Sequence, residues 1–239
     1  MALLTVDHVR VEFGGIVALA DLSFTIDEGQ ICALIGPNGA GKTTLFNCVS
    51  RLYQPKEGSI EFDGHNLLAL PAHRIARLGI SRTFQNLALF PALSIAQNVM
   101  VGAHSRGGSS RSRRADALEL LRRLGLADLA ERPAAGLPYG TLKRVEIARA
   151  LAARPKLLLL DEPAAGLTHS EVDELAELVQ TIRADFELSV LLVEHHMAMV
   201  MAISDTVVVL DFGSKIAEGP PAAIKDDPLV IEAYLGTPA

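Results

Sequence analysis

Residues 31–44 read ICALIGPNGAGKTT and decide the fold. The strand-like run ICALIG leads directly into a glycine-rich loop, and the helical pattern LFNCVSRL follows. The loop residues are Gly36, Pro37, Asn38, Gly39, Ala40, Gly41, Lys42, Thr43 and Thr44. Strand, loop and helix in this order match G-x-x-x-x-G-K-[ST] in the context that the motif requires, so we predict a phosphate-binding loop.

Each part of this loop has a chemical reason. Glycines let the backbone curl so that successive N–H groups point at phosphate oxygens, and the helix N-terminus adds a positive dipole. Lys42 would bring a charge to the β- and γ-phosphates of a nucleotide, and the Thr43 hydroxyl would bind Mg²⁺. A chance glycine-rich turn is the alternative, and it is poor because motif and context agree.

An acidic pair follows a second buried strand, in LLLLDEP at 157–163. Asp161 is placed to hold Mg²⁺, directly or through water. Side chains alternate along a strand, so we expect Glu162 to point differently and to act as the general base for the attacking water. Acidic residues at the start of a helix are the alternative, since THSEVDEL follows. After a matched phosphate loop that alternative is the weaker one.

Two further polar residues stand near strand ends. His195 follows the run SVLLVE, where a histidine can sense a γ-phosphate, and Gln85 follows GISRTF, where an amide can touch Mg²⁺ or the water. Taken alone, a strand-end histidine is more often structural and a single glutamine means nothing. Both gain weight only beside the phosphate loop and the acidic pair.

The rest of the chain alternates between strand-like and helix-like runs, which predicts an α/β fold with a mainly parallel sheet. The expected strands are 3–12, 16–26, 31–36, 157–161, 189–194 and 206–211. The expected helices are 94–103, 114–125 and about 140–153, so residues 86–150 look like an inserted helical subdomain. The basic run at 104–114 favours a solvated loop over lipid or nucleic-acid binding, and a hairpin and terminal helices follow residue 213.

Composition narrows the function. The 239 residues carry a net charge of -6, which argues against general nucleic-acid binding. No apolar run approaches the roughly 18 residues of a membrane span, and the N-terminus lacks a signal-peptide pattern. If a membrane is involved, we therefore expect the protein to work beside it. Cys32 and Cys48 lie in apolar runs and read as buried thiols of a reducing cytoplasm.

Taken in order, these elements resemble the ATP-binding cassette (ABC) family over the whole chain. The resemblance implies a P-loop NTPase core with an antiparallel β subdomain and an inserted α-helical subdomain. It implies one domain at 1–239, with the nucleotide-binding core at 1–85 and 151–239 and the helical subdomain at 86–150. Phe13 resembles the aromatic residue that stacks on adenine, and Gln85 the glutamine that links nucleotide and membrane subunit. His195, rather than His196, matches the switch histidine.

The segment LPYGTLKRVEIARAL at 137–151 is similar to the family's signature, usually LSGGQ before a basic helix. Leu137 and Gly140 match, whereas Pro138, Tyr139 and Thr141 replace serine, glycine and glutamine. In the family this segment closes over ATP held by the other subunit, so Leu137, Tyr139 and Gly140 are counted among the nucleotide contacts. Pro138 has neither hydroxyl nor N–H, and our hypothesis is that the Gly140 amide and the helix N-terminus make the contact.

A second departure follows the acidic pair, where Ala165-Gly166-Leu167-Thr168 stands for the family's SALD. Without the aspartate, communication between the two ATP sites of a dimer is expected to rest on backbone contacts.

Finer features resemble the ATPases of branched-chain amino acid importers: FGGIVAL at 13–19, SRTFQNLALFP at 81–91, DEPAAGLT at 161–168, VEHHMAMVMAISD at 193–205 and the ending EAYLG. This likeness implies ATP and Mg²⁺ as cofactors and a second ATP-binding subunit as partner. It also implies permease subunits, an indirect solute-binding protein, and a peripheral place on the cytoplasmic membrane face. The stretch 87–91 is expected either to dock a permease helix or to be a core turn. A urea or amide importer, lipid export and a non-transport ABC ATPase remain alternatives.

Overall fold

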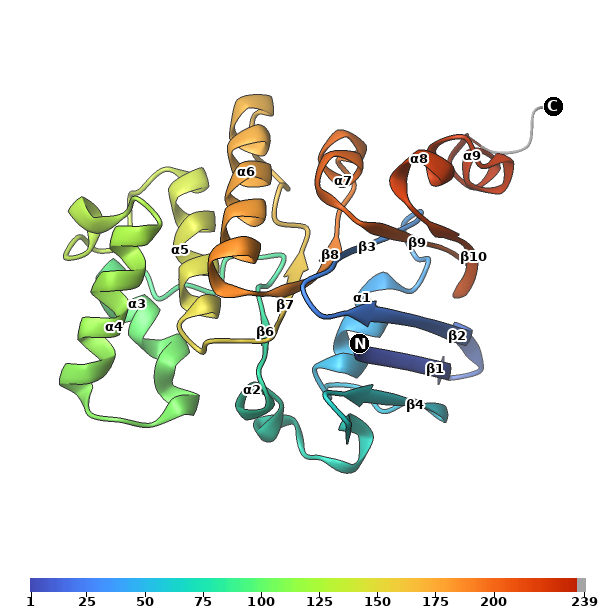
Figure 1. Ribbon diagram of the computed structural model, residues 1–239, viewed down its shortest axis with the longest axis horizontal. Coiled ribbons are helices and arrows are strands. Elements are labelled where there is room, and N and C mark those ends of the chain that lie inside the picture. The colour runs from blue at the N-terminus through green and yellow to red at the C-terminus, as the bar shows by residue number, and fades with distance from the viewer. Residues whose placement is uncertain (236–239) are drawn as a thin grey trace.

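Two β-sheets lie on either side of α1 (Lys42–Val49), and further helices cover the outer face of the larger sheet (Figure 1). The structure is a computed structural model that describes residues 1–235. The last glycine of the EAYLG ending, Gly236, therefore lies outside the described residues.

The larger sheet has six strands in the order β10-β9-β3-β8-β7-β6, parallel except for β10. These are β3 (Ile31–Ile35), β6 (Ile80–Arg82), β7 (Leu157–Asp161), β8 (Ser189–Val193), β9 (Thr206–Asp211) and β10 (Ser214–Gly219). The smaller sheet is antiparallel, in the order β2-β1-β4-β5. It consists of β1 (Ala2–Phe13), β2 (Ile16–Asp27), β4 (Glu57–Phe62) and β5 (His65–Asn66).

The remaining helices follow α1 in chain order. They are α2 (Ile75–Leu78), α3 (Ile95–Gly102), α4 (Ser110–Arg123), α5 (Tyr139–Leu151), α6 (His169–Phe186), α7 (Met197–Ile203), α8 (Pro221–Lys225) and α9 (Pro228–Leu235). Single 3₁₀ turns lie at Leu67–Ala69, Ala72–Arg74, Ala103–Arg106 and Ala127–Leu129. In Figure 1, α3, α4 and α5 form a group at one end of the molecule and α8 and α9 lie at the other.

The central strands are buried on both faces because their residues alternate between two cores. Leu157 and Leu159 pack into the core between the two sheets, together with α1. Leu158 and Leu160 pack into the core beneath α3 to α7. Period-two alternation therefore explains why β3, β7 and β8 read as unbroken apolar runs. The predicted α/β class, with an antiparallel β sheet and a largely parallel one, is confirmed.

The structure differs from the sequence prediction in several elements. Strands β4 and β5 and helix α2 were not predicted. The run at 104–114 is mostly not a loop, since a 3₁₀ turn covers Ala103–Arg106 and α4 begins at Ser110, four residues before the predicted start. The reason is a cap that a composition argument ignores: the Ser109 hydroxyl accepts the Ser112 N–H at 3.1 Å.

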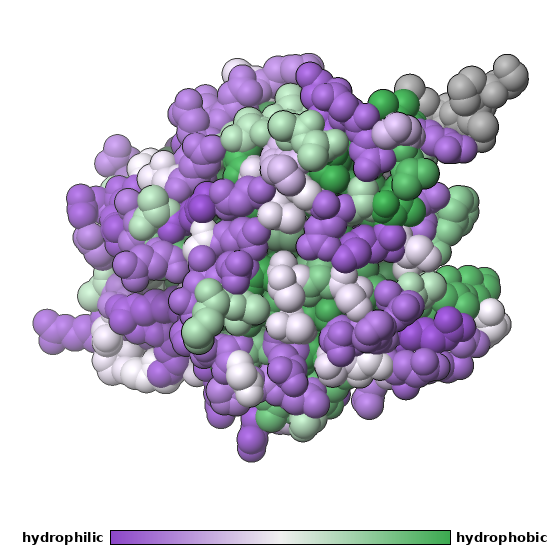
Figure 2. Space-filling model, turned by 45° about the vertical axis from the view of Figure 1, so that its right-hand side comes forward, coloured by the Kyte–Doolittle hydropathy of each residue, from purple (hydrophilic) through white to green (hydrophobic). Residues whose placement is uncertain are grey.

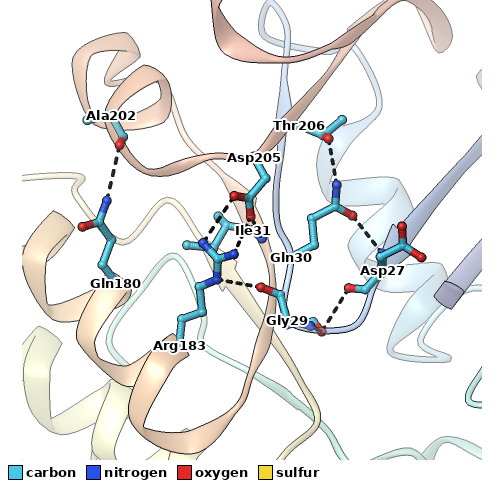
Figure 3. Close-up of polar contacts among 10 residues, drawn as sticks. Asp27, Gly29, Gln30, Ile31, Gln180, Arg183, Ala202, Asp205 and Thr206 are labelled. Atoms are coloured by element: carbon cyan, nitrogen blue, oxygen red, sulfur yellow. Dashed lines mark hydrogen bonds and ion pairs between the residues drawn. The ribbon is translucent and has the colours of Figure 1, made fainter. Parts of the chain in front are cut away.

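Polar contacts brace the amino ends of the central strands (Figure 3). Arg183 of α6 donates to the Gly29 carbonyl at 2.6 Å and pairs with Asp205 at 3.0 Å. Asp205 also accepts the Ile31 N–H at 2.7 Å, where β3 begins. One guanidinium therefore links α6, β3 and the start of β9, at the edge opposite the phosphate loop.

The surface is mixed. Figure 2 shows hydrophilic residues over most of the visible face, with hydrophobic ones gathered near the C-terminal end. Helix α9 contributes exposed Leu229 and Ile231. Within residues 1–235, no helix combines the length and apolarity that a membrane span needs. Cys32 and Cys48 are buried free thiols, as predicted, and burial raises the pKa of Cys48 to about 12.

A glycine sets how closely α3 can approach α5. An added Cβ at Gly102 would lie 1.8 Å from the Arg149 carbonyl oxygen, which is backbone and cannot rotate away. We predict that Gly102→Ala lowers the free energy of unfolding by about 3 kcal/mol, measured by urea denaturation. In Gly219→Ala the new methyl would meet only ordinary contacts at 3.8 Å, so this control should be at least as stable as the parent. Equal stability of the two variants would contradict the close approach.

Candidate active site

The phosphate loop begins directly after β3, at Gly36, where the neighbouring strand leaves no space for a side chain. Gly36 has φ 148°, and a Cβ there would lie 2.1 Å from the Leu210 carbonyl oxygen of β9. The loop then curls to Gly41, the N-cap of α1, which has φ 103° and provides no side-chain cap. The first-turn amides of α1 are therefore not capped by a side chain and can bind an anion.

Lys42 spans the mouth of this loop. It is buried, and its Nζ donates to the carbonyl oxygens of Gly36 at 2.7 Å and Pro37 at 2.9 Å. Burial lowers its pKa, an effect that the charges of Glu162 and Asp161 oppose. The ammonium thus stands between the loop and the acidic pair, where a phosphate charge would favour its protonated form.

Three of the predicted residues meet beside the loop. The Gln85 amide donates to Glu162 Oε2 at 2.8 Å, and His195 Nε2 lies 3.1 Å from Glu162 Oε1. The Glu162 side chain is 18 % exposed, so solvent can reach it. One carboxylate therefore has an amide on one oxygen and an imidazole on the other, both from different strand ends.

The direction of Glu162 has another cause than the one predicted. Strand β7 ends at Asp161, so strand alternation does not set the next side chain. Instead Glu162 lies in the left-handed region with φ 47°, and its N–H bonds to the Val193 carbonyl at 2.9 Å. Strained backbone of this kind is concentrated at functional sites, because the surroundings must hold it there.

Arg82 is a site residue that sequence reasoning missed. It pairs with Asp161 Oδ2 at 2.8 Å and donates to Asn47 of α1 at 2.8 Å, with its side chain only 10 % exposed. Its guanidinium also lies 5.4 Å from the ring centres of Phe46 and Phe84. A charge inside the short strand before Gln85 was the available signal.

Glu194 is a second missed residue. Its buried carboxylate accepts the N–H of Ala164 at 2.6 Å, of His195 at 2.7 Å and of His196 at 3.1 Å. Through it the segment after the acidic pair is tied to the histidine turn. Of the two histidines, it is His195 whose ring reaches Glu162, as the sequence prediction preferred.

The signature residues lie apart from this cluster. Pro138 is the N-cap of α5, so Tyr139 and Gly140 stand in its first turn. The Tyr139 ring packs against Gly166, where an added Cβ would lie 3.2 Å from it, and Gly140 faces Glu171. Leu137 packs on the core beneath the helices. In the chain alone Tyr139 therefore contacts the segment after the acidic pair, whereas Gly140 faces α6.

Phe13 lies at the end of β1 and is half exposed. Its ring meets that of Tyr53 edge to face, with centroids 5.1 Å apart. The pair offers an aromatic surface at the tip of the β1–β2 hairpin.

The donors available to Mg²⁺ are oxygens. Thr43 is exposed in the first turn of α1, Gln85 carries an amide oxygen, and Asp161 keeps one carboxylate oxygen beside the one paired with Arg82. Hard oxygen ligands suit Mg²⁺. In the part of the chain that the structure describes, no group of three or more His, Cys, Asp or Glu is arranged to hold a metal. The oxygen atoms of Thr43, Gln85 and Asp161 thus have the chemistry that Mg²⁺ prefers.

A phosphate loop at the end of a central parallel strand, with a carboxylate pair, glutamine and histidine at neighbouring strand ends, defines the ATPases of the ATP-binding cassette class. Comparison with known proteins agrees. Residues 19–165 match the family model "ABC transporter", and residues 214–239 match "Branched-chain amino acid ATP-binding cassette transporter". The chain belongs to the ABC transporter family of ATP-binding, ATP-hydrolysing proteins.

Individual relatives cover nearly the whole chain. The high-affinity branched-chain amino acid transport ATP-binding protein BraF of Pseudomonas aeruginosa is 42% identical over 98% of both chains. The lipopolysaccharide export ATP-binding protein LptB of Escherichia coli K12 is 36% identical over 99% of this chain and 98% of its own. A dimeric ATP-binding cassette bound to ADP and Pi superposes with a TM-score of 0.80 at 27% identity, covering 91% of this chain and 98% of that one.

The buried pair of Arg82 and Asp161 leads to a prediction. We expect Arg82→Met to lower the free energy of unfolding by about 3 kcal/mol, because it leaves Asp161 buried without its cation. A urea-unfolding cycle with Asp161→Asn should give a coupling energy above about 1 kcal/mol. Arg114→Met, which removes the exposed pair with Glu131, is the control and should leave the midpoint unchanged. Additive effects in the cycle would mean that the buried pair contributes no interaction.

Proposed function

We propose that this chain is the ATP-hydrolysing subunit of an ABC importer for branched-chain amino acids, bound to the cytoplasmic face of the membrane. The observation that carries the proposal is the match of residues 214–239 to the branched-chain amino acid cassette model, in a chain that is 42% identical to BraF. Identity to the lipopolysaccharide exporter subunit is lower, at 36%, which favours import over the lipid-export alternative.

The proposed chemistry uses the cluster around Glu162. ATP binds with its phosphates on residues 36–44 and Lys42, and its adenine on Phe13. Glu162 removes a proton from a water molecule while the water oxygen attacks the γ-phosphorus. The bond between the γ-phosphorus and the β-γ bridging oxygen breaks, which gives ADP and phosphate. Gln85 and His195 hold the carboxylate, and the histidine contacts the γ-phosphate.

Mg²⁺ would be held by Thr43, Gln85 and Asp161 together with the phosphates. When bound, it neutralises charge on the phosphate oxygens. Arg82 keeps one oxygen of Asp161 engaged and so orients the other towards the site. This role is supported by the 2.8 Å pair, which is anchored to α1 through Asn47.

The complete site needs two chains. The signature residues Leu137, Tyr139 and Gly140 lie at the start of α5 and pack on Gly166 and the core rather than on residues 36–44. We infer that they close over ATP held by a second ATP-binding subunit, a copy or a paralogue. The uncapped first turn of α5 supplies amides, including that of Gly140, for the phosphate contact.

The permease is proposed to dock on residues 87–91, beside Gln85. Phe90 in this stretch is 49 % exposed, and neighbouring Phe84 is 44 % exposed, which favours a docking surface over a core turn. We further propose that 1–239 is a single domain, with residues 86–150 as its helical subdomain carrying the docking stretch. A solute-binding protein would act through the permeases, and no nucleic acid takes part.

Replacing the proposed base separates binding from turnover. We predict that Glu162→Gln lowers kcat by roughly 10²–10⁴-fold while ATP still binds, and that the variant accumulates as a closed dimer. Steady-state phosphate release and size-exclusion chromatography with ATP measure both effects. Glu177→Gln, on the exposed side of α6, is the control and should keep wild-type values. Undiminished turnover in Glu162→Gln would remove this residue from its assigned role.

The importer assignment is tested on native membranes. We expect a gentle-detergent pull-down of the chain to contain two multi-span permeases, identified by mass spectrometry. Cells lacking the chain should lose high-affinity uptake of labelled leucine, and Glu162→Gln should not restore it. Co-purification with only soluble ribosomal or DNA-associated proteins would refute transport and leave the ATPase chemistry intact.

A further inference from the structure

The segment that carries Gln85 has irregular backbone between β6 and α3, so its polar groups need partners outside a sheet or helix. They find them on one helix, α5. The Phe84 N–H donates to Glu146 Oε1 at 3.1 Å, and the Gln85 carbonyl accepts from Lys143 Nζ at 3.4 Å. The Ala88 carbonyl accepts from the Arg149 guanidinium.

The three α5 residues share one face of the helix. Lys143, Glu146 and Arg149 are spaced three apart, so they stand one above the other along α5. Each meets a different backbone group of the loop: Glu146 that of Phe84, Lys143 that of Gln85 and Arg149 that of Ala88. We call these three residues the α5 clamp.

Charges in this position are costly unless they are used. Lys143 and Glu146 are each 2 % exposed, and Arg149 lies 3.5 Å from Glu146. Burial raises the pKa of Glu146 and lowers that of Arg149, while the Phe84 and Ala88 amides favour the charged form of Glu146. An apolar face could fill the same space, and buried ion pairs are weak evidence for stability. The clamp is therefore better explained by its grip on the loop.

The clamp lies between the two halves of the proposed site. Lys143 Nζ stands 5.6 Å from the centre of the Tyr139 ring in the signature turn. The same Nζ donates to the Gln85 carbonyl, and the Gln85 side-chain amide donates to Glu162 at 2.8 Å. A single lysine thus touches the signature turn and the backbone of the residue that contacts the proposed base.

The docking stretch is held in the same way from α3. The buried Asn98 amide accepts the Phe90 N–H at 2.8 Å and donates to the Phe90 carbonyl at 3.1 Å. Helix α3 in turn packs tightly on α5 at Gly102. Both ends of residues 84–90 are therefore fixed to the same pair of helices.

We propose that Lys143, Glu146 and Arg149 are positioning residues that make residues 84–90 and α5 one rigid body. The clamp then fixes where the Gln85 amide stands relative to Glu162. The proposal rests on the proposed function, because it assigns the clamp to ATP hydrolysis at that site. It adds three residues that act through Gln85 and do not touch ATP.

The test combines Lys143→Met, Lys143→Arg, Glu146→Gln and the control Arg144→Met. Arg144 lies on the same helix but pairs with Glu174 of α6, away from the loop. Steady-state ATPase assays give kcat, a fluorescent ATP analogue gives nucleotide affinity, and hydrogen exchange with mass spectrometry follows residues 84–90. Melting temperatures identify any variant that fails to fold.

We expect Lys143→Met to speed exchange of residues 84–90 and to lower kcat by roughly 10- to 100-fold, with nucleotide affinity unchanged because the phosphate loop is intact. Lys143→Arg should restore part of the activity. Glu146→Gln keeps an acceptor for the Phe84 N–H, so its kcat should fall less than that of Lys143→Met. Arg144→Met should match the parent.

Two outcomes would overturn the proposal. Unchanged exchange in Lys143→Met would mean that the clamp does not hold the loop, and faster exchange with unchanged kcat would mean that holding it does not serve hydrolysis. If Lys143→Met does not fold, Lys143→Arg and Glu146→Gln decide between the same outcomes. A parent chain that fails to hydrolyse ATP would instead refute the proposed function, which the same assay detects separately.

Discussion

The structure depends on one close approach, between Gly36 and the Leu210 carbonyl oxygen. Strand β3 lies between β8 and β9, so its carboxyl end can only leave the sheet past a neighbouring strand. At 2.1 Å from an added Cβ, that carbonyl admits no side chain, and the φ of 148° also favours glycine. The chain therefore turns at once into the phosphate loop, and the ends of β7 and β8 bring Glu162 and His195 to the same edge. Ligands of open α/β sheets bind at such carboxyl edges for this reason.

Much of this edge could be predicted from the sequence, because its motifs coincide with strand ends. The phosphate loop, the acidic pair and His195 each follow an apolar run, and parallel strands carry such positions to one side. Arg82 and Glu194 were not predicted because their roles depend on partners distant in sequence. Asp161 is 79 residues from Arg82, and Ala164 is 30 residues from Glu194. The start of α4 was predicted too late for a local reason. The Ser109 cap starts the helix although the residues that follow are polar. The roles of the site residues stay predictions, whereas their positions are structural facts.

Buried charge is used repeatedly in this chain to fix segments that have no regular structure. Glu194 holds three backbone amides, and the α5 clamp holds the loop around Gln85. In each case a strand-end or loop segment must keep one conformation without sheet or helix bonds, and a charged side chain supplies strong hydrogen bonds at a low local dielectric. The cost is desolvation, which these residues offset by bonding to several groups at once. Each of these segments therefore has its conformation fixed by the element that carries the charge.

The departures in the signature follow the same logic of backbone in place of side chain. Pro138 cannot donate, but as N-cap it fixes the entry to α5 and leaves the first-turn amides of Tyr139 and Gly140 uncapped by any side chain. Tyr139 stands where the family usually has a glycine, and its ring packs on Gly166. Gly166 belongs to the stretch that replaces the family's SALD, and its lack of a side chain leaves space for this ring. The two departures therefore compensate each other sterically: a larger signature residue meets a smaller residue after the acidic pair. Because the ring also lies under Lys143, this packing joins the signature turn to the segment that holds Gln85.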